Sequence, residues 1–209
     1  MTNTLHRKGS SQALKQDFVV FALPKRDMFS LEELVSKLKT FTDICLSHHP
    51  INMGKYENRS LRGIDPRRMA EEMEDSIALT AVYGDVETLG SVIKALVAAD
   101  LGISINISGL MDDVQQCCRD AGITRHSAEQ SLGIFGRTEL LPSREVLEIN
   151  TLCGHGLVSF NLIQKVLTEI KLDRMSPEEG AYQLARPCQC GVFNLQRAQQ
   201  LLESMRLKG

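Results

Sequence analysis

The sequence has no excess of charge of one sign and no long apolar run. Its 24 Lys and Arg residues nearly balance 26 Asp and Glu residues, and the formal net charge is -2 over 209 residues. A dedicated nucleic-acid-binding protein usually carries a strongly basic face, so this balance argues against that class, although a local basic patch stays open. No apolar run approaches the roughly 18 residues of a transmembrane helix, so we expect no membrane association.

Targeting signals and the standard nucleotide and hydrolase motifs are also missing. Residues 1–16 lack the apolar stretch of a signal peptide, and we interpret them as a disordered tail of a cytoplasmic protein. No G-x-G-x-x-G follows a strand, and no glycine loop ends in Gly-Lys-Ser/Thr. No G-x-S-x-G elbow occurs either. Any chemistry must therefore come from a less standard site.

Apolar patterning predicts an α/β domain over residues 17–140. We expect strands at 18–23, 77–82, 103–107 and 132–135, and helices at 30–48, 85–102 and 109–121. The strand–helix–strand unit within residues 77–107 is expected to be right-handed with parallel strands. This order favours a layered α/β sheet containing a βαβ unit, with a ferredoxin-like α+β sandwich as the close alternative.

Residues 141–209 are expected to form a helical region, because strand signals stop after Pro142. The predicted helices are Ser143–Asn150, Leu157–Leu172, Glu178–Leu184 and Val192–Leu207. They form a separate subdomain or lie on the sheet, and we find no convincing internal repeat. The apolar stripe of the last helix suits packing within the chain or a homo-oligomer interface equally well; its residues are Leu195, Ala198, Leu201, Leu202 and Met205.

The main candidate site joins Cys153-Gly-His155-Gly to Cys188-Gln-Cys190-Gly. Clustered cysteines in an intracellular chain indicate metal or redox chemistry more often than disulfides. Three thiolates and an imidazole suit tetrahedral zinc. The same thiolates, with His155 or an external ligand at the fourth iron, suit an iron–sulfur cluster, which we favour slightly. His155 would be the fourth ligand or an acid/base.

Two alternatives use the same residues without a metal. Cys153 precedes a predicted helix whose N-terminus would lower the thiol pKa, and His155 would act as base, with Cys188 and Cys190 as a resolving pair. The other alternative is four ordinary core residues, since cysteine is commonly buried. The flanking glycines fill a core poorly, which weakens this second alternative for the cluster as a whole.

The remaining cysteines and histidines are expected to be structural. Cys45 continues the apolar stripe of its helix, and His48 and His49 suit capping of the same helix. Cys117 and Cys118 are adjacent in a predicted helix and point in different directions, so we expect one in the core and one near the surface.

A basic stretch is a candidate clamp for a small anionic molecule. Residues 51–75 are interpreted as a loop followed by a short helix from Asp65-Pro66. The clamp would use Arg59, Arg62, Arg67 and Arg68, although a solvated charged loop is the more common role of such a stretch.

The preferred function is thus a metal- or iron–sulfur-dependent cytoplasmic protein, and an enzyme acting on a small anionic molecule is one form that this function can take. The rival class is a non-catalytic binding or assembly module with structural zinc or buried thiols. An open coordination position would favour the enzyme and a closed four-coordinate site the module. Asp112 and Asp113, at a strand-to-helix turn, are explained equally well as ligands or as helix caps.

Overall fold

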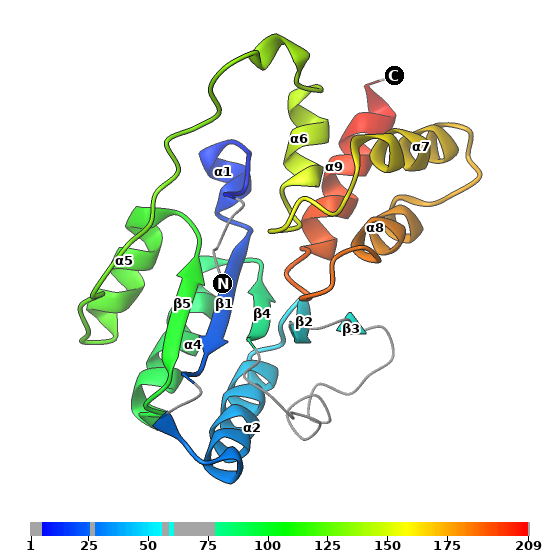
Figure 1. The fold of residues 1–209 in the computed structure, drawn as a ribbon. Coiled ribbons are helices and arrows are strands. Elements are labelled where there is room, and N and C mark those ends of the chain that lie inside the picture. The colour runs from blue at the N-terminus through cyan, green and yellow to red at the C-terminus, as the bar shows by residue number, and fades with distance from the viewer. Residues whose placement is uncertain (1–5, 26–27, 56–58, 61–77, 209) are drawn as a thin grey trace.

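The computed structural model describes residues 6–25, 28–55, 59–60 and 78–208 (Figure 1). Its strands are β1 (Phe18–Leu23), β2 (Asn52–Lys55), β3 (Arg59–Ser60), β4 (Leu79–Tyr83) and β5 (Ser104–Ser108). Its helices are α1 (Ser11–Leu14), α2 (Leu31–Ser47), α4 (Val86–Ala99), α5 (Met111–Asp120), α6 (Arg144–Asn150), α7 (Phe160–Lys171), α8 (Pro177–Ala185) and α9 (Leu195–Leu207), with a 3-10 turn at Thr138–Leu140.

The described strands form one sheet in the order β3-β2-β4-β1-β5, with every neighbouring pair antiparallel. Strands β4 and β5, joined through α4, run in the same direction as a βαβ unit requires, but β1 lies between them. The mixed α/β fold with a helical C-terminal region is confirmed. The expected parallel neighbours are replaced by the split, ferredoxin-like arrangement, because the fully apolar β1 takes the position between β4 and β5.

Local sequence signals set the helix boundaries. The Ser30 hydroxyl accepts from the Glu33 N–H, and the Glu33 carboxylate accepts from the Ser30 N–H at 2.9 Å, which completes the capping box of α2. Helix α4 begins at Asp85, whose carboxylate accepts from the Thr88 N–H at 2.7 Å. The four predicted C-terminal helices also form, with ends within three residues of those expected.

Both faces of β1 are covered. Phe18, Val20 and Ala22 belong to a core shared with α2, α4 and α5, whereas Val19 and Phe21 belong to a second core shared with the C-terminal helices. The C-terminal region therefore packs on the face of the sheet opposite to α2 and α4. The apolar stripe of α9 is used here, since its buried positions Ala198, Leu202 and Met205 lie in the second core.

Three segments differ from the sequence expectations. Residues 132–135 form no strand; Gly133 and Gly136 have φ of 98° and 96°, outside the extended region, and Phe135 is 78% exposed. Strands β2 and β3 form a hairpin within the predicted loop 51–75, where their short and polar sequences gave no strand signal. Residues 6–16, expected as tail, include α1 and lie against the body of the protein.

A buried ionic network holds that N-terminal segment in place. The Asp17 carboxylate accepts from Arg7 Nε at 3.0 Å and from Arg197 Nη1 at 2.7 Å, and all three side chains are at most 5% exposed. Arg197 also donates to Glu148 at 3.3 Å. The network ties the start of β1 to α6 and α9, which are otherwise distant in the sequence.

The described residues include no helix that combines the length and apolar character required to cross a membrane.

Replacing Asp17 by Asn should destabilise the protein strongly, since the buried Arg7 and Arg197 guanidinium groups would both lose their ion pair with Asp17, and Arg197 would be left with its longer pair to Glu148. We expect the free energy of unfolding to fall by about 3–5 kcal/mol, the usual effect of breaking a buried ion pair from one side. Urea denaturation measures it. The control is Glu139→Gln, which breaks the exposed pair with Arg137 and should leave the transition unchanged. A loss for Asp17→Asn below about 1 kcal/mol would contradict the role of the network.

Candidate functional site

The predicted cysteine site lies in two turns that have the same chain path. The first turn connects α6 to α7 and carries Cys153 and His155; the second connects α8 to α9 and carries Cys188 and Cys190. In each turn the first cysteine lies three residues after the last residue of a helix and six before the N-cap of the next, Ser159 or Asn194.

Equivalent positions in the two turns are 35 residues apart, as Cys153 and Cys188 are. At that spacing, His155 corresponds to Cys190, and Gly156 to Gly191. The two glycines have φ of 67° and 70°, a left-handed conformation that favours glycine, so each turn reverses at the same point.

The correspondence extends into the flanking helices. Pairs of residues 35 positions apart are buried in the second core: Val146 and Ala181, Ile149 and Leu184, Ile163 and Ala198, Ile170 and Met205. The region is thus two consecutive helix–turn–helix units, contrary to our expectation of no internal repeat. Few positions are identical, and the usable sequence signal was C-x-[H/C]-G-[L/V] followed two residues later by an N-capping Ser or Asn.

Backbone N–H groups point at the sulfur atoms in both turns. The N–H groups of His155 and Leu157 donate to the Cys153 thiol, and the Val192 N–H donates to the thiols of Cys188 and Cys190. Leu157 and Val192 are themselves equivalent positions. Because N–H donors stabilise a thiolate over a thiol, both turns provide surroundings suited to anionic sulfur.

The three thiols form a hydrogen-bonded chain between the two turns. Cys153, Cys188 and Cys190 are 0%, 1% and 2% exposed. The hydrogen bond to Cys188, together with burial, raises the pKa of Cys153. The hydrogen bond from Cys153 lowers the pKa of Cys188. The hydrogen bond from Cys188 to Cys190, together with burial, has the larger combined effect and raises the pKa of Cys188 to about 11. Both pKa shifts favour the thiol over the thiolate at these two residues.

Cys190 is the thiol that favours ionisation. The hydrogen bond from Cys188 lowers the pKa of Cys190 despite its burial. The imidazole of the exposed His155 closes the cluster from the solvent side, with Nδ1 3.6 Å from the Cys190 sulfur. The expectation that the N-terminus of a helix makes Cys153 the acidic thiol does not hold, since its proton is retained by the bond to Cys188.

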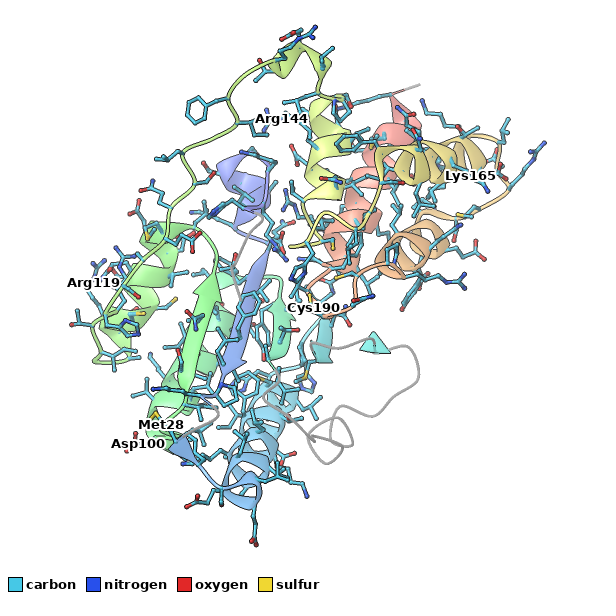
Figure 2. The ribbon with its side chains drawn as sticks, in the orientation of Figure 1. Met28, Asp100, Arg119, Arg144, Lys165 and Cys190 are labelled. Carbon is cyan, nitrogen blue, oxygen red and sulfur yellow. The ribbon has the colours of Figure 1, made fainter. Side chains whose placement is uncertain are left out.

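The second turn is pressed against the sheet. A Cβ on Gly54 of β2 would lie 2.4 Å from the Cys190 carbonyl oxygen, so only glycine fits at this contact. The Thr80 hydroxyl of β4 donates to the same carbonyl. Figure 2 shows Cys190 where the connection after α8 reaches the end of β2. The sheet therefore fixes the position of Cys190.

Arg7 connects the two turns at their backbones. Its Nη2 donates to the Val192 carbonyl at 2.7 Å and to the Leu152 carbonyl at 3.4 Å. Its Nε binds Asp17. The N-terminal segment, which gave no sequence signal beyond its charge, thus supports both halves of the cluster.

A metal ion would need the thiols to exchange their present hydrogen bonds for bonds to the metal. In the described part of the chain, no group of three or more His, Cys, Asp or Glu side chains is arranged to hold a metal ion as it stands. The thiols instead bond to one another. With zinc–sulfur and zinc–nitrogen bonds of about 2.3 and 2.1 Å, ligands of a tetrahedral ion lie about 3.6 Å apart. The separation between His155 and Cys190 already has this value.

Cys45 and His48 have contacts that fit structural roles. Burial raises the pKa of Cys45 to about 12, and its carbonyl accepts from the Tyr83 hydroxyl at 3.1 Å. His48 Nδ1 lies 2.9 Å from the Ile44 carbonyl at the end of α2, as helix capping requires. Cys117 and Cys118 are both 5% exposed, so the expectation that one lies near the surface was wrong.

The proposed anion clamp falls almost wholly outside the described residues. Arg62, Arg67 and Arg68 are among those not described, and of Arg59 only the backbone in β3 is placed. In the β2–β3 pairing, Ser60 lies opposite Gly54, the residue that contacts Cys190. Strand β3 therefore pairs with β2 at the residue that contacts the second turn.

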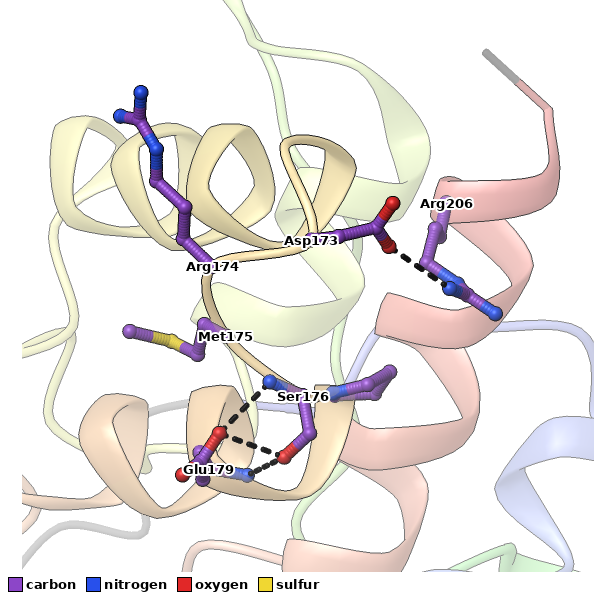
Figure 3. Close-up of a pocket in the computed structure, with 7 residues that line it drawn as sticks. Asp173, Arg174, Met175, Ser176, Glu179 and Arg206 are labelled. Carbon is purple, nitrogen blue, oxygen red and sulfur yellow. Dashed lines mark hydrogen bonds and ion pairs between the residues drawn. The ribbon is translucent and has the colours of Figure 1, made fainter.

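A polar hollow lies at the connection between α7 and α8 (Figure 3). Its cations have acidic partners: Arg206 with Asp173 at 3.5 Å and Arg174 with Glu169 at 3.9 Å. The Glu179 carboxylate caps α8 through Ser176. These internal pairings leave the hollow without the excess positive charge that an anion site needs.

Comparisons of the chain with known protein families, with curated proteins and with solved structures found no significant match. Function is therefore inferred from the cysteine turns themselves.

Replacing Gly54 by Ala should separate the second turn from the sheet. The new methyl group would meet backbone atoms of Cys190 and Gly191, which cannot rotate away. We expect about 1–3 kcal/mol of destabilisation in urea denaturation, together with faster labelling of Cys190 by a thiol reagent. Gly90→Ala in α4 is the matched control, because its methyl group would meet Cys117 at an ordinary 3.6 Å. Equal stability of the two variants would disprove the close contact.

Proposed function

We propose that the protein binds a single soft metal ion, zinc in the first instance, between its two cysteine turns. Cys153, Cys188 and Cys190 would be the thiolate ligands and His155 the fourth ligand. The observation that carries this proposal is the repeated turn, which brings two ligand residues from each helix–turn–helix unit to one place. Ligands supplied in pairs from two turns are typical of zinc sites with sulfur and nitrogen ligands.

The backbone N–H groups of the turns support thiolate ligands. Metal binding requires release of the thiol protons, and the N–H groups of His155, Leu157 and Val192 are placed to stabilise the resulting charge. The same proton release removes the sulfur–sulfur hydrogen bonds. A metal ion that attracts all three sulfurs would then replace that network of bonds.

The hydrogen bonds that link the three thiols favour one ion over an iron–sulfur cluster. Ligands of one tetrahedral zinc ion lie about 3.6–3.8 Å apart, close to hydrogen-bond contact between sulfurs. In a cluster, each thiolate binds a different iron atom with sulfide between the irons, which keeps cysteine sulfurs farther apart. The hydrogen-bonded chain from Cys153 to Cys190 is thus better suited to a mononuclear site, in contrast to our initial preference.

The proposed protein acts in the cytoplasm and has a small external ligand. Cysteines that must stay reduced suit the cytoplasm. A small anionic molecule is a suitable ligand, since β3, which begins with Arg59, pairs with β2 at Gly54, the residue that contacts the second turn. Metal binding would serve an enzyme if an external molecule reaches the ion, and an assembly module if it does not.

A metal-free thiol function is the second candidate, because Cys153 and Cys188 are hydrogen-bonded to each other. Their direct contact would allow a disulfide between the two units. Formation of that disulfide would release two protons and transfer two electrons to a disulfide oxidant.

Metal content decides between these functions. Protein purified under reducing conditions should contain about one zinc per chain, and its cobalt-substituted form should show sulfur-to-cobalt charge-transfer absorption. Cys188→Ser should lose this absorption, whereas Cys118→Ser, in α5 and outside the cluster, should retain it. Circular dichroism establishes that both variants are folded.

Three other results would overturn the zinc proposal. Iron with acid-labile sulfide, dependent on Cys188, would establish a cluster instead. A metal-free protein that forms a Cys153–Cys188 disulfide with oxidised glutathione would establish the thiol function. A metal-free protein that forms no such disulfide would make the cysteines ordinary core residues.

A further inference from the structure

We infer that His155 is the exchangeable ligand of the metal site, the position at which an external molecule reaches the ion. This inference rests on the proposed function and makes it more specific. His155 and Cys190 occupy equivalent positions in the two units, but they differ in their exposure to solvent. The inference follows from this difference.

The two positions share a chain path but not their surroundings. Each lies two residues after the first cysteine of its turn and one residue before the left-handed glycine. Cys190 is 2% exposed, whereas His155, Gly156 and Leu157 are all exposed. Of the four ligand positions, His155 is thus the one in contact with solvent.

The sheet accounts for this difference. Gly54 and Thr80 hold the second turn at the carbonyl of Cys190, so a shift of Cys190 would break contacts inside the core. A Cβ on Gly154, next to His155, would meet only the Val192 side chain, at 3.8 Å. At Gly154 the first turn thus lacks the tight backbone contact that Gly54 makes with the second turn, and His155 is exposed while Cys153 is buried.

A histidine at the exposed position makes the metal site less negative than a cysteine would. Zinc with three thiolates and a neutral imidazole has a net charge of about -1, against about -2 with a fourth thiolate. The less negative ion attracts an incoming anion or thiolate more readily. Catalytic zinc sites likewise combine three protein ligands with one exchangeable position. Three cysteine ligands and one histidine ligand thus favour an anion or a thiol as the external ligand.

Imidazole rescue on the cobalt-substituted full-length protein tests the inference. His155→Ala should keep the charge-transfer absorption of three thiolates, lose metal affinity by about tenfold or more, and change its visible d–d bands. Adding free imidazole should restore the d–d bands, because the vacated position is open to solvent. The wild-type protein should show a similar band shift with a small thiol such as 2-mercaptoethanol.

The matched control changes the equivalent buried position. Cys190→Ala should lose part of the charge-transfer absorption, and imidazole should not restore its d–d bands, because the sheet closes access to that position. Circular dichroism and the charge-transfer absorption together show that each variant is folded and loaded.

The outcomes separate this inference from the proposed function. If the wild type binds cobalt through Cys188 but His155→Ala has an unchanged spectrum and affinity, His155 is not a ligand and only the inference fails. Rescue of both variants by imidazole would also sink the inference, since the two positions would be equally open. A wild type without any Cys188-dependent cobalt spectrum overturns both.

Discussion

The apolar interior strand β1 has to be covered on both faces, and the remainder of the chain is arranged around this requirement. Helices α2, α4 and α5 cover the side of Phe18 and Val20, and the C-terminal helices cover the side of Val19 and Phe21. Hydrophobic burial on both sides is favourable at about 25 cal/mol per Å² of apolar surface. It brings the second helix–turn–helix unit against the sheet, where the contact between Gly54 and Cys190 fixes one side of the thiol cluster.

The two cysteine turns have the same backbone path, but they lie in different surroundings. Two turns with the same backbone reversal each direct N–H groups at a first cysteine, and the duplication explains why four ligand-type side chains meet. The sheet then breaks the equivalence, because it buries Cys190 and leaves His155 at the surface. Arg7 bonds to the backbone of both turns and so limits how far the units can separate.

The sequence predicted the features that depend on local patterns. The capping box at Ser30 and the apolar stripes placed the helices, and the glycine-flanked cysteines placed the site. Strand order could not be predicted, since it depends on which strand is most fully buried after packing. The hairpin of β2 and β3 was missed because Gly54 is selected by its contact with Cys190 and carries no strand propensity. The buried role of Arg7 depends on partners such as Val192, 185 residues away.

The link between Asp17 and Arg197 joins residues 180 positions apart and so bears on how the chain reaches its native state. Each helix–turn–helix unit has mainly local contacts and can form early, but loops of this length close slowly. During synthesis from the N-terminus, Val19 and Phe21 emerge long before the helices that cover them. The sheet therefore has an uncovered apolar face until α9 has been synthesised, and exposed apolar surface of this kind favours aggregation.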